Sequence, residues 1–335
     1  MKAAVFRKIG TPFSIEQMAD PLPRPGEIVL KVGRCGICGS DLHMTQSQAY
    51  EREGGLVFGH EFAGEVVALG RDAGTVTVGD RVAALPVTGC GQCSACLAGE
   101  PAYCPQRRLE FGGFAEYVVA RARETVALPA VLAMDDGALI EPLAVALHGV
   151  KLVDMQPGAR VLVMGAGPIG LAVAYWVRRL GAGRVVVMAR SSRSAAIALQ
   201  VGASAFVPQS LHAVEEVRDA LVGPPEIVFE CGGTPGLIDT CLTHVAPRGS
   251  VVILGILGGL DQITPRTGIQ KEARLLFSAF YSVRDFAIVA DRLASGDTAP
   301  RAMITGTVGL AELPAAFEAL RQRTTHCKLM LDPWR

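Results

Sequence analysis

Four cysteines lie close together in one short stretch of the chain. The segment reads GCGQCSACLAGEPAYC, so Cys90, Cys93, Cys96 and Cys104 have the spacing C-x2-C-x2-C-x7-C. Four thiolates this close can surround one tetrahedral ion, and Zn²⁺ favours four sulfur ligands in closed structural sites. A disulfide framework is not expected in a chain of this size without a secretory signal. The spacing therefore predicts a structural zinc lobe over about residues 88–106.

A second set of metal-binding residue types lies nearer the N-terminus. The segment CGICGSDLH contains Cys38, and the segment GHE contains His60 and Glu61. Thiolate, imidazole and carboxylate together suit Zn²⁺. By spacing alone, Cys35 and Cys38 could also form a chelating pair. Neighbours on an extended chain face opposite ways, so His60 and Glu61 bind one ion only at a bend. We interpret this set as the metal site that does chemistry.

A glycine-rich turn forms a third set. The strand-like run ARVLVMGA leads into a G-x-G-x-x-G motif, and a helix-like segment follows over 168–180. In this context the glycines allow a tight turn, close approach of a pyrophosphate and tight helix packing. The helix N-terminus favours the anion through its free N–H groups and its dipole. A turn of an unrelated α/β domain is the alternative. The predicted dinucleotide site comprises Gly165, Gly167, Pro168, Ile169 and Gly170.

The end of the next strand-like run bears on which dinucleotide fits. An NAD site places Asp or Glu there, about twenty residues after the glycines, to hold the ribose hydroxyls. Here RVVVMARSSRS has Ala189 at that place, followed by Arg190, Ser191, Ser192 and Arg193. No carboxylate is present to repel a 2′-phosphate, and arginine binds phosphate by bidentate hydrogen bonds. We expect NADP(H) to be preferred. If the arginines are only solvated charges at a helix start, the cofactor is NAD.

The chain around these motifs has two textures. Up to about residue 150, short β-like runs are broken by turn residues such as Pro25-Gly26, which predicts a mostly antiparallel barrel. After residue 158, apolar strand-like runs alternate with helix-like segments, and such βα repeats form a parallel sheet with helices on both faces. The tail from about 284 returns to mixed character. We predict an α/β protein with one domain at 1–151 and 284–335, and a dinucleotide-binding domain at 152–283.

Length and composition limit the classes of function. A chain of 335 residues favours two domains, and half of its residues are apolar. The net charge of +0, without a basic block, argues against nucleic acid as a main partner. No run of about twenty apolar residues lacks charges or Gly and Pro breaks, so no membrane span is expected. The N-terminus MKAAVFRKIG has no apolar signal core, so we expect a cytoplasmic location.

The motifs described above make the chain resemble the zinc-dependent medium-chain alcohol and polyol dehydrogenases over essentially its whole length. The sorbitol, butanediol and threonine dehydrogenase branch is the most similar. The motifs C-G-I-C-G-S-D-x-H, G-H-E, the four cysteines and G-x-G-x-x-G occur in the family order. The resemblance implies a GroES-like, mostly-β catalytic domain and a doubly wound Rossmann domain. It also implies two zinc ions per chain and a homodimer or homotetramer.

The resemblance assigns the catalytic zinc ligands. Cys38 and His60 match two of them, whereas Cys35 is expected to point into the barrel. In the family, the glutamate that corresponds to Glu61 sometimes binds zinc directly and sometimes contacts a zinc ligand instead. In ALIEPLA, Glu141 stands where classical alcohol dehydrogenases have a second cysteine, and it reaches zinc directly or through water in the polyol branch. A helix-capping carboxylate is the alternative for Glu141. Whether Glu61, Glu141 or water completes the shell stays open at this point.

The resemblance also assigns the proton path. In the family, zinc acts as a Lewis acid on the substrate oxygen, and hydride passes between the carbinol carbon and the nicotinamide. A hydroxyl, here Ser40, passes the proton through the nicotinamide ribose to a histidine, here His43, and on to solvent. Asp41 is expected to orient His60. Two further residues are expected beside the nicotinamide: Gly255 and Tyr281.

The expected function is NADP(H)-dependent interconversion of a small secondary alcohol, diol or polyol and its ketone. Met44 takes the place where some sorbitol dehydrogenases carry Tyr, which favours a less hydroxylated substrate. An NAD-dependent polyol or amino-alcohol dehydrogenase is one alternative. A zinc-free quinone or enoyl reductase is another, although Cys38, His60 and Glu141 argue against it. A non-enzymatic NADPH-binding protein is the third. The strand near SVVILG is expected to offer an edge for pairing between subunits.

Overall fold

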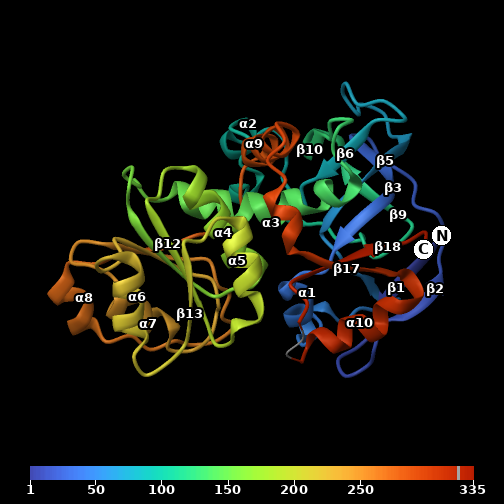
Figure 1. Cartoon of the computed structure of the whole chain (residues 1–335). Coiled ribbons are helices and arrows are strands. Elements are labelled where there is room, and N and C mark those ends of the chain that lie inside the picture. The colour runs from blue at the N-terminus through green and yellow to red at the C-terminus, as the bar shows by residue number, and fades with distance from the viewer. Residues whose placement is uncertain (323–324) are drawn as a thin grey trace. The chain divides into compact units, whose positions relative to one another are not determined.

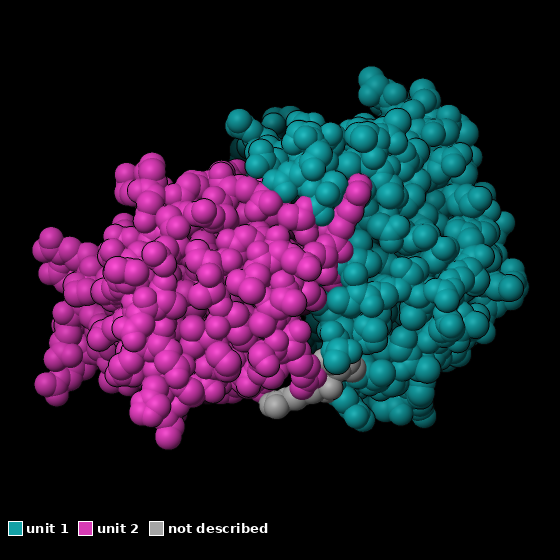
Figure 2. All heavy atoms as spheres, viewed as in Figure 1, with its two compact units in different colours: residues 1–141, 281–298, 304–335 teal, residues 142–280, 299–303 magenta. Residues whose placement is uncertain are grey.

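The computed structural model describes residues 1–322 and 325–335, which form two compact units (Figures 1 and 2). Unit 1 consists of Met1–Glu141, Tyr281–Thr298 and Ile304–Arg335, and unit 2 consists of Pro142–Phe280 and Ala299–Met303. The border in sequence lies inside helix α3 (Met134–Lys151), earlier than the expected residue 151. The chain returns to unit 1 at Tyr281, near the expected residue 284.

Unit 1 is built mainly on antiparallel sheets, in line with its turn-rich sequence. The main sheet has the order β10-β6-β5-β3-β18-β17, with β9 also paired to β3, and β17 and β18 run parallel. Smaller sheets have the orders β2-β1-β4 and β7-β8. The strands are β1 (Lys2–Phe6), β2 (Ser14–Gln17), β3 (Glu27–Gly36), β4 (Leu56–Val57), β5 (Glu61–Leu69), β6 (Arg81–Ala84), β7 (Val87–Thr88), β8 (Arg108–Leu109), β9 (Tyr117–Arg121), β10 (Thr125–Ala127), β17 (Ile304–Gly309) and β18 (Lys328–Asp332).

The helices of unit 1 are short, and its core is rich in phenylalanine. Phe13 meets Phe317 edge-on at 4.8 Å and Phe58 at 6.0 Å, an arrangement that suits the aromatic quadrupoles. Cys35 lies fully buried in the same core, as expected. Besides the first part of α3, the helices are α1 (Gly39–Met44), α2 (Ser94–Leu97), α9 (Val283–Ala294) and α10 (Leu313–Leu320).

Unit 2 is a parallel sheet with the order β13-β12-β11-β14-β15-β16, as the alternating βα sequence predicts. Helices α4 and α5 lie on one face, and α6 and α7 lie on the other (Figure 1). The apolar strands are buried on both faces by this arrangement. The elements are β11 (Arg160–Met164), α4 (Pro168–Arg179), β12 (Arg184–Ala189), α5 (Ala195–Val201), β13 (Ala205–Pro208), α6 (Ala213–Leu221), β14 (Ile227–Glu230), α7 (Leu237–His244), β15 (Ser250–Ile253), α8 (Pro265–Lys271) and β16 (Arg274–Phe277).

The strand of SVVILG does not lie at either edge of this sheet. That segment forms β15, which is paired on both sides, with β14 and with β16. The two edges of the sheet belong to β13 and to β16, the strand that follows β15, and the sequence analysis singled out neither. Within residues 1–322 and 325–335, none of the helices has the length and apolar character needed to cross a membrane.

Candidate catalytic and cofactor sites

The ends of two paired strands bring Cys38 and His60 together. β3 and β5 run antiparallel with Gly36 opposite Glu61, so the residues after β3 and before β5 lie at the same end of the sheet. Cys38 precedes α1 at this end, and His60 immediately precedes β5. The Cys38 thiol, a His60 ring nitrogen and a Glu61 carboxylate oxygen lie within 4.8 Å of one another. Thiolate, imidazole and carboxylate at this separation fit a zinc ion.

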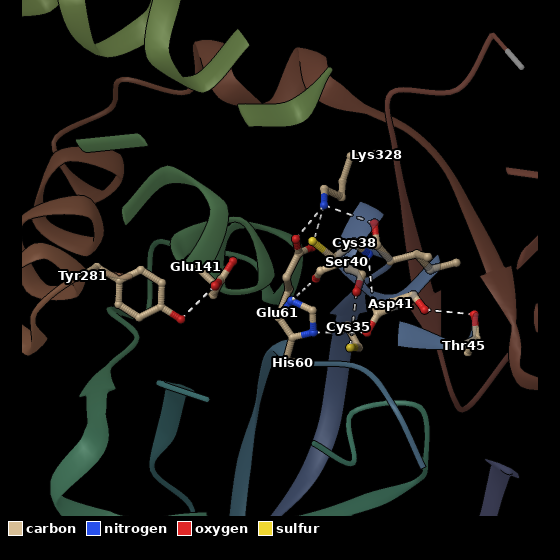
Figure 3. Close-up of polar contacts among 12 residues, drawn as sticks. Cys35, Cys38, Ser40, Asp41, Thr45, His60, Glu61, Glu141, Tyr281 and Lys328 are labelled. Atoms are coloured by element: carbon tan, nitrogen blue, oxygen red, sulfur yellow. Dashed lines mark hydrogen bonds and ion pairs between the residues drawn. The ribbon is translucent and has the colours of Figure 1, made fainter. Parts of the chain in front are cut away.

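The orientation of the His60 ring is fixed by Asp41. His60 Nδ1 lies 3.1 Å from Asp41 Oδ1, and the Cys38 N–H donates to the other oxygen of that carboxylate at 3.0 Å. Ser40 Oγ lies 3.3 Å from His60 Nε2 (Figure 3). Burial lowers the pKa of His60, but Asp41 and Cys38 together outweigh burial and raise it well above its ordinary value. A hydrogen bond to one ring nitrogen leaves the other to face a metal.

Glu61 is held by a buried lysine that the sequence analysis did not single out. Lys328 begins β18, and the pairing of Met330 with Gly36 sets it beside the end of β3. Its ammonium donates to the two Glu61 oxygens at 2.7 and 2.6 Å and to the Ile37 carbonyl at 3.1 Å (Figure 3). Burial lowers the pKa of Lys328, but the Glu61 charge helps to raise it above its ordinary value. A Cβ on Gly36 would lie 2.0 Å from Glu61 Oε2, so this position needs glycine.

Glu141 approaches the same site from helix α3 and has a different partner. The Tyr281 hydroxyl donates to Glu141 Oε1 at 2.7 Å, and both side chains are buried (Figure 3). Burial raises the pKa of Glu141 to about 7, and the negative charge of Glu61 adds to this while His60 opposes it. Glu141 does not belong to the group within 4.8 Å formed by Cys38, His60 and Glu61. It therefore lies at the margin of the site.

Helix α1, which carries the predicted proton-transfer residues, is pinned at its far end. Thr45 Oγ1 lies 3.0 Å from the carbonyl oxygens of both Asp41 and Leu42. Arg321, just after α10, donates to Thr45 Oγ1 at 2.9 Å and to the Leu42 carbonyl at 3.2 Å. His43 is exposed on this helix. The arrangement holds a buried Asp41 and an accessible His43 on one short helix.

The four cysteine thiols of the predicted lobe converge. Their sulfur atoms lie within 4.8 Å of one another. Backbone N–H groups point at them: that of Cys90 donates to Cys104 Sγ at 3.3 Å, and that of Cys93 donates to Cys90 Sγ at 3.4 Å. Hydrogen bonds from the Gln92 and Cys93 backbone lower the pKa of Cys90 to about 6, whereas burial raises the pKa of Cys96 to about 12. The Cys90 thiolate is stabilised by these backbone hydrogen bonds, and the convergence of four thiols fits a tetrahedral zinc ion.

The glycine turn has the geometry that a dinucleotide site needs. Gly165 has φ +117°, and a Cβ on Gly170 would lie 1.9 Å from the Gly165 carbonyl oxygen, so both positions need glycine for the chain's own packing. Gly167 differs, because a Cβ there would meet no atom within 4 Å. Its missing side chain instead leaves room for a ligand at the N-terminus of α4, which begins with Pro168. A pyrophosphate fits this space.

The basic segment lies beside this turn. β12 ends at Ala189, and the Gly165 N–H donates to the Met188 carbonyl at 2.8 Å, so the two strand ends are adjacent. Arg190 and Arg193, which follow, are exposed, and Ser191 is half-buried. The adjacency places the predicted adenosine-ribose residues at the same edge of the sheet as the glycines.

The end of β14 carries a buried carboxylate that sequence reasoning missed. Glu230 Oε1 accepts hydrogen bonds from the N–H groups of Gly232 at 2.8 Å and Gly233 at 2.7 Å. A Cβ on Gly255 would lie 2.2 Å from the Gly233 nitrogen and 2.4 Å from Glu230 Oε2. Gly255 is therefore required by close packing at the carboxyl edge of the sheet. An acidic residue directly before a C-G-G turn was the available signal for Glu230.

Known proteins share both units. Residues 24–130 match the family model of the alcohol dehydrogenase GroES-like domain, and residues 168–295 match that of zinc-binding dehydrogenases. Sorbitol dehydrogenase of Bacillus subtilis (strain 168) is 29% identical over 100% of this chain and 98% of its own length. The 2-dehydro-3-deoxy-L-galactonate 5-dehydrogenase of Pseudoalteromonas atlantica is 31% identical over 88% of each chain. The chain belongs to the zinc-dependent medium-chain dehydrogenase/reductase family.

Solved structures of this family extend the likeness to three dimensions. A protein of Sinorhizobium meliloti 1021 bound to NADP is 31% identical, with a TM-score of 0.88 over 99% of each chain. An alcohol dehydrogenase of Escherichia coli CFT073 complexed with NADH is 28% identical, with a TM-score of 0.89 over 99% of each chain. The resemblance seen in the sequence is thereby confirmed. The chain is an oxidoreductase of the alcohol and polyol dehydrogenase class that uses zinc and a nicotinamide cofactor.

Proposed function

We propose that this dehydrogenase interconverts a secondary alcohol, diol or polyol and its ketone, with two zinc ions per chain and with NADP(H) preferred over NAD(H). The convergence of Cys38, His60 and Glu61 within 4.8 Å, with Ser40 Oγ 3.3 Å from the His60 ring, carries the proposal. When bound, zinc polarises the substrate oxygen and the nicotinamide exchanges the hydride. All other roles fall to the chain's own side chains.

Ser40 is the group that moves the substrate proton. Its hydroxyl can accept the proton of the substrate hydroxyl while passing its own proton on, as a positioned general base does. His43, exposed on the same helix, releases the proton to solvent. Asp41 accepts from His60 Nδ1 and thereby keeps the lone pair of Nε2 available to the metal.

Glu141, directly or through water, is the better candidate than Glu61 to complete the catalytic zinc shell. Glu61 receives two short hydrogen bonds from the Lys328 ammonium, and charge-assisted bonds are about twice as strong as neutral ones. Glu141 receives one bond from the neutral Tyr281 hydroxyl. Releasing Glu141 therefore costs less than releasing Glu61. Its position at the margin of the site suits a water between carboxylate and metal.

The preference for NADP(H) rests on the residues after β12. The related structures bound to NADP and to NADH show that the family accepts both cofactors, so the family alone does not decide. Arg190 and Arg193 are exposed at the edge that carries the glycine turn, and no carboxylate stands between Met188 and Ser194. An arginine bound to a 2′-phosphate contributes about 1.5–3 kcal/mol, or about 10- to 100-fold in affinity.

Steady-state kinetics with both cofactors test this preference. We expect a higher kcat/KM with NADP⁺ than with NAD⁺, and the double variant R190A/R193A should lower the NADP⁺ value about 10- to 100-fold while leaving the NAD⁺ value nearly unchanged. R184A, at the opposite end of β12, is the matched control and should change neither value. A clear preference of the unaltered enzyme for NAD⁺ contradicts the proposal.

Metal content tests the two proposed zinc ions, and a substrate panel tests the proposed substrate class. Two zinc ions per chain are expected by elemental analysis, and C96S should lose one of them. A zinc-free preparation with full turnover of quinones or enoyl substrates would instead favour the reductase alternative. Met44, half-buried against the phenylalanine-rich core, favours a less hydroxylated secondary alcohol or diol. Turnover confined to hexitols in a panel of alcohols, diols and polyols contradicts this point.

A homodimer formed through β16 is the assembly that the surface supports. An edge strand carries unpaired N–H and C=O groups, and two copies can pair them antiparallel about a two-fold axis. Large apolar side chains of β16 and of the chain segment before it are exposed, which is a feature of surfaces that bind another protein. The most exposed of them are Ile256 (70%), Leu260 (97%), Ile269 (75%) and Phe277 (72%). The N–H groups of Arg274 and Ser278 face β15, so by alternation that of Phe277 faces the open edge. F277P, which removes this N–H and the exposed ring, should release monomers in sedimentation experiments, whereas a wild-type monomer contradicts the proposal.

A further inference from the structure

The four-cysteine lobe contacts the start of helix α9. The Val283 N–H donates to the Gly99 carbonyl at 2.9 Å. Gly99 closes the turn after α2, where its own N–H donates to the Cys96 carbonyl at 3.0 Å. The residue that begins α2 as its N-cap is Cys93. Two of the four converging cysteines therefore fix the backbone that presents the Gly99 carbonyl.

The backbone at the start of α9 is held by side-chain hydrogen bonds, so a shift of Val283 would also move Tyr281. Ser282 and Asp285 form a capping box, in which Ser282 Oγ accepts from the Asp285 N–H at 3.1 Å and the Ser282 N–H donates to Asp285 Oδ2 at 2.9 Å. Such reciprocal bonds fix the entry of the chain into a helix. Tyr281 directly precedes this box, so the anchor at Val283 and the Tyr281 ring belong to one short, constrained segment.

Tyr281 in turn holds Glu141. Its hydroxyl donates to Glu141 Oε1 at 2.7 Å, and its ring packs against Phe286 of α9 with the centroids 5.0 Å apart. A cavity of about 210 Å³ lies at the contact between the lobe and α9, with Cys96, Gly99 and Val283 in its lining. Side chains thus do not fill this contact completely. The Val283–Gly99 hydrogen bond is accordingly a specific link there.

We propose that the four-cysteine lobe positions Tyr281 and, through it, Glu141. The lobe takes no part in the chemistry, because all four ligand positions of its metal come from protein, yet it sets where a carboxylate of the catalytic site stands. Val283 is the positioning residue in this link. The inference rests on the proposed role of Glu141 and adds how the four-cysteine lobe holds the Glu141 carboxylate in place.

The variant V283P removes the link with little cost to the helix. Proline is favoured at the first helical position, where Val283 stands, and Ser282 already has the extended backbone that a residue before proline requires (φ −99°, ψ 163°). The proline ring replaces the N–H with a carbon, so Gly99 loses its donor and must move away. V283A keeps the N–H and is the matched control.

We expect V283P to lower kcat about tenfold, V283A to stay within twofold of wild type, and KM for the nucleotide to stay within twofold in both. Y281F should lower kcat at least as much as V283P, and the double variant should be no slower than Y281F alone, because both changes act on one link. If Y281F lowers kcat and V283P does not, the inference is wrong while the proposed function stands. If Y281F retains full turnover, the proposed role of Glu141 fails, and the inference fails with it.

Hydrogen exchange gives a readout that is independent of turnover and of how well V283P folds. In C96S, which removes one thiolate of the lobe, amide exchange over residues 281–286 should be about tenfold faster than in wild type. Exchange over β11 and β12 in unit 2 should be unchanged and serves as the internal reference. Unchanged exchange over 281–286 in C96S would overturn the inference, whatever its effect on activity.

Discussion

Replacing Lys328 with methionine should destabilise unit 1 strongly, because it leaves a charged carboxylate buried without a partner. Lys328 and Glu61 are each 1% exposed, and the ammonium contacts both Glu61 oxygens at 2.7 and 2.6 Å. Removing one member of a buried ion pair costs about 3–5 kcal/mol. The Ile37 carbonyl also loses its donor, which adds about 1 kcal/mol. We therefore expect K328M to lower the free energy of unfolding by about 4–6 kcal/mol.

Urea unfolding at neutral pH, followed by far-UV circular dichroism, measures this change through the midpoint and slope. The double variant E61Q/K328M is the control, because it removes both charges and keeps similar volumes. Neutral replacement of a whole buried pair is often neutral or stabilising, so the double variant should recover most of the loss. The freed Glu61 lies within 4.8 Å of the Cys38 and His60 donor atoms, so added zinc should reduce the loss in K328M. A loss below about 1 kcal/mol in K328M, or no recovery in E61Q/K328M, would refute the reasoning.

Three further predictions concern proton transfer, metal affinity and pH. S40A should lower kcat about 10²- to 10⁴-fold, with zinc content by elemental analysis unchanged, because a general base is lost but no ligand is. D41N should lower catalytic-site zinc affinity about 10- to 100-fold in a competitive chelator titration, because His60 loses the carboxylate that orients it. Burial, with Lys271 nearby, lowers the pKa of His244 from 6.5 to about 4, so native His244 stays neutral where the unfolded chain binds a proton. Stability should therefore be retained above pH 6.5 and fall by about 2 kcal/mol between pH 7.5 and pH 5, and H244N should show that much less pH dependence in urea unfolding.

Much of the fold could be predicted from the sequence because short motifs and the alternation of strands and helices determine it. The four-cysteine spacing and the strand–glycine–helix unit each act within about twenty residues, and both appear in the structure where they were expected. The alternation of apolar strands with helices likewise predicted the parallel sheet of unit 2. The edge strand was misplaced, since the order of strands in a sheet depends on crossovers and not on the composition of any one strand. β15 and β16 are both short, and only their neighbours distinguish the inner strand from the edge.

The residues of the candidate site that local motifs could not identify are the partners of buried charges. A buried carboxylate must be compensated, since leaving it unpaired costs several kcal/mol. The motif GHE locates Glu61, yet the chain holds 32 Lys and Arg residues from which a partner could come. The pairing of β18 with β3, with Met330 opposite Gly36, is what selects Lys328. Glu230 is compensated by hydrogen bonds from the N–H groups of its own turn. Glu141 is compensated by a hydrogen bond from Tyr281, which lies 140 positions away in the sequence. The compensation of Glu230 was therefore accessible to local reasoning, whereas the partners of Glu61 and Glu141 become identifiable only when the tertiary structure brings their segments together.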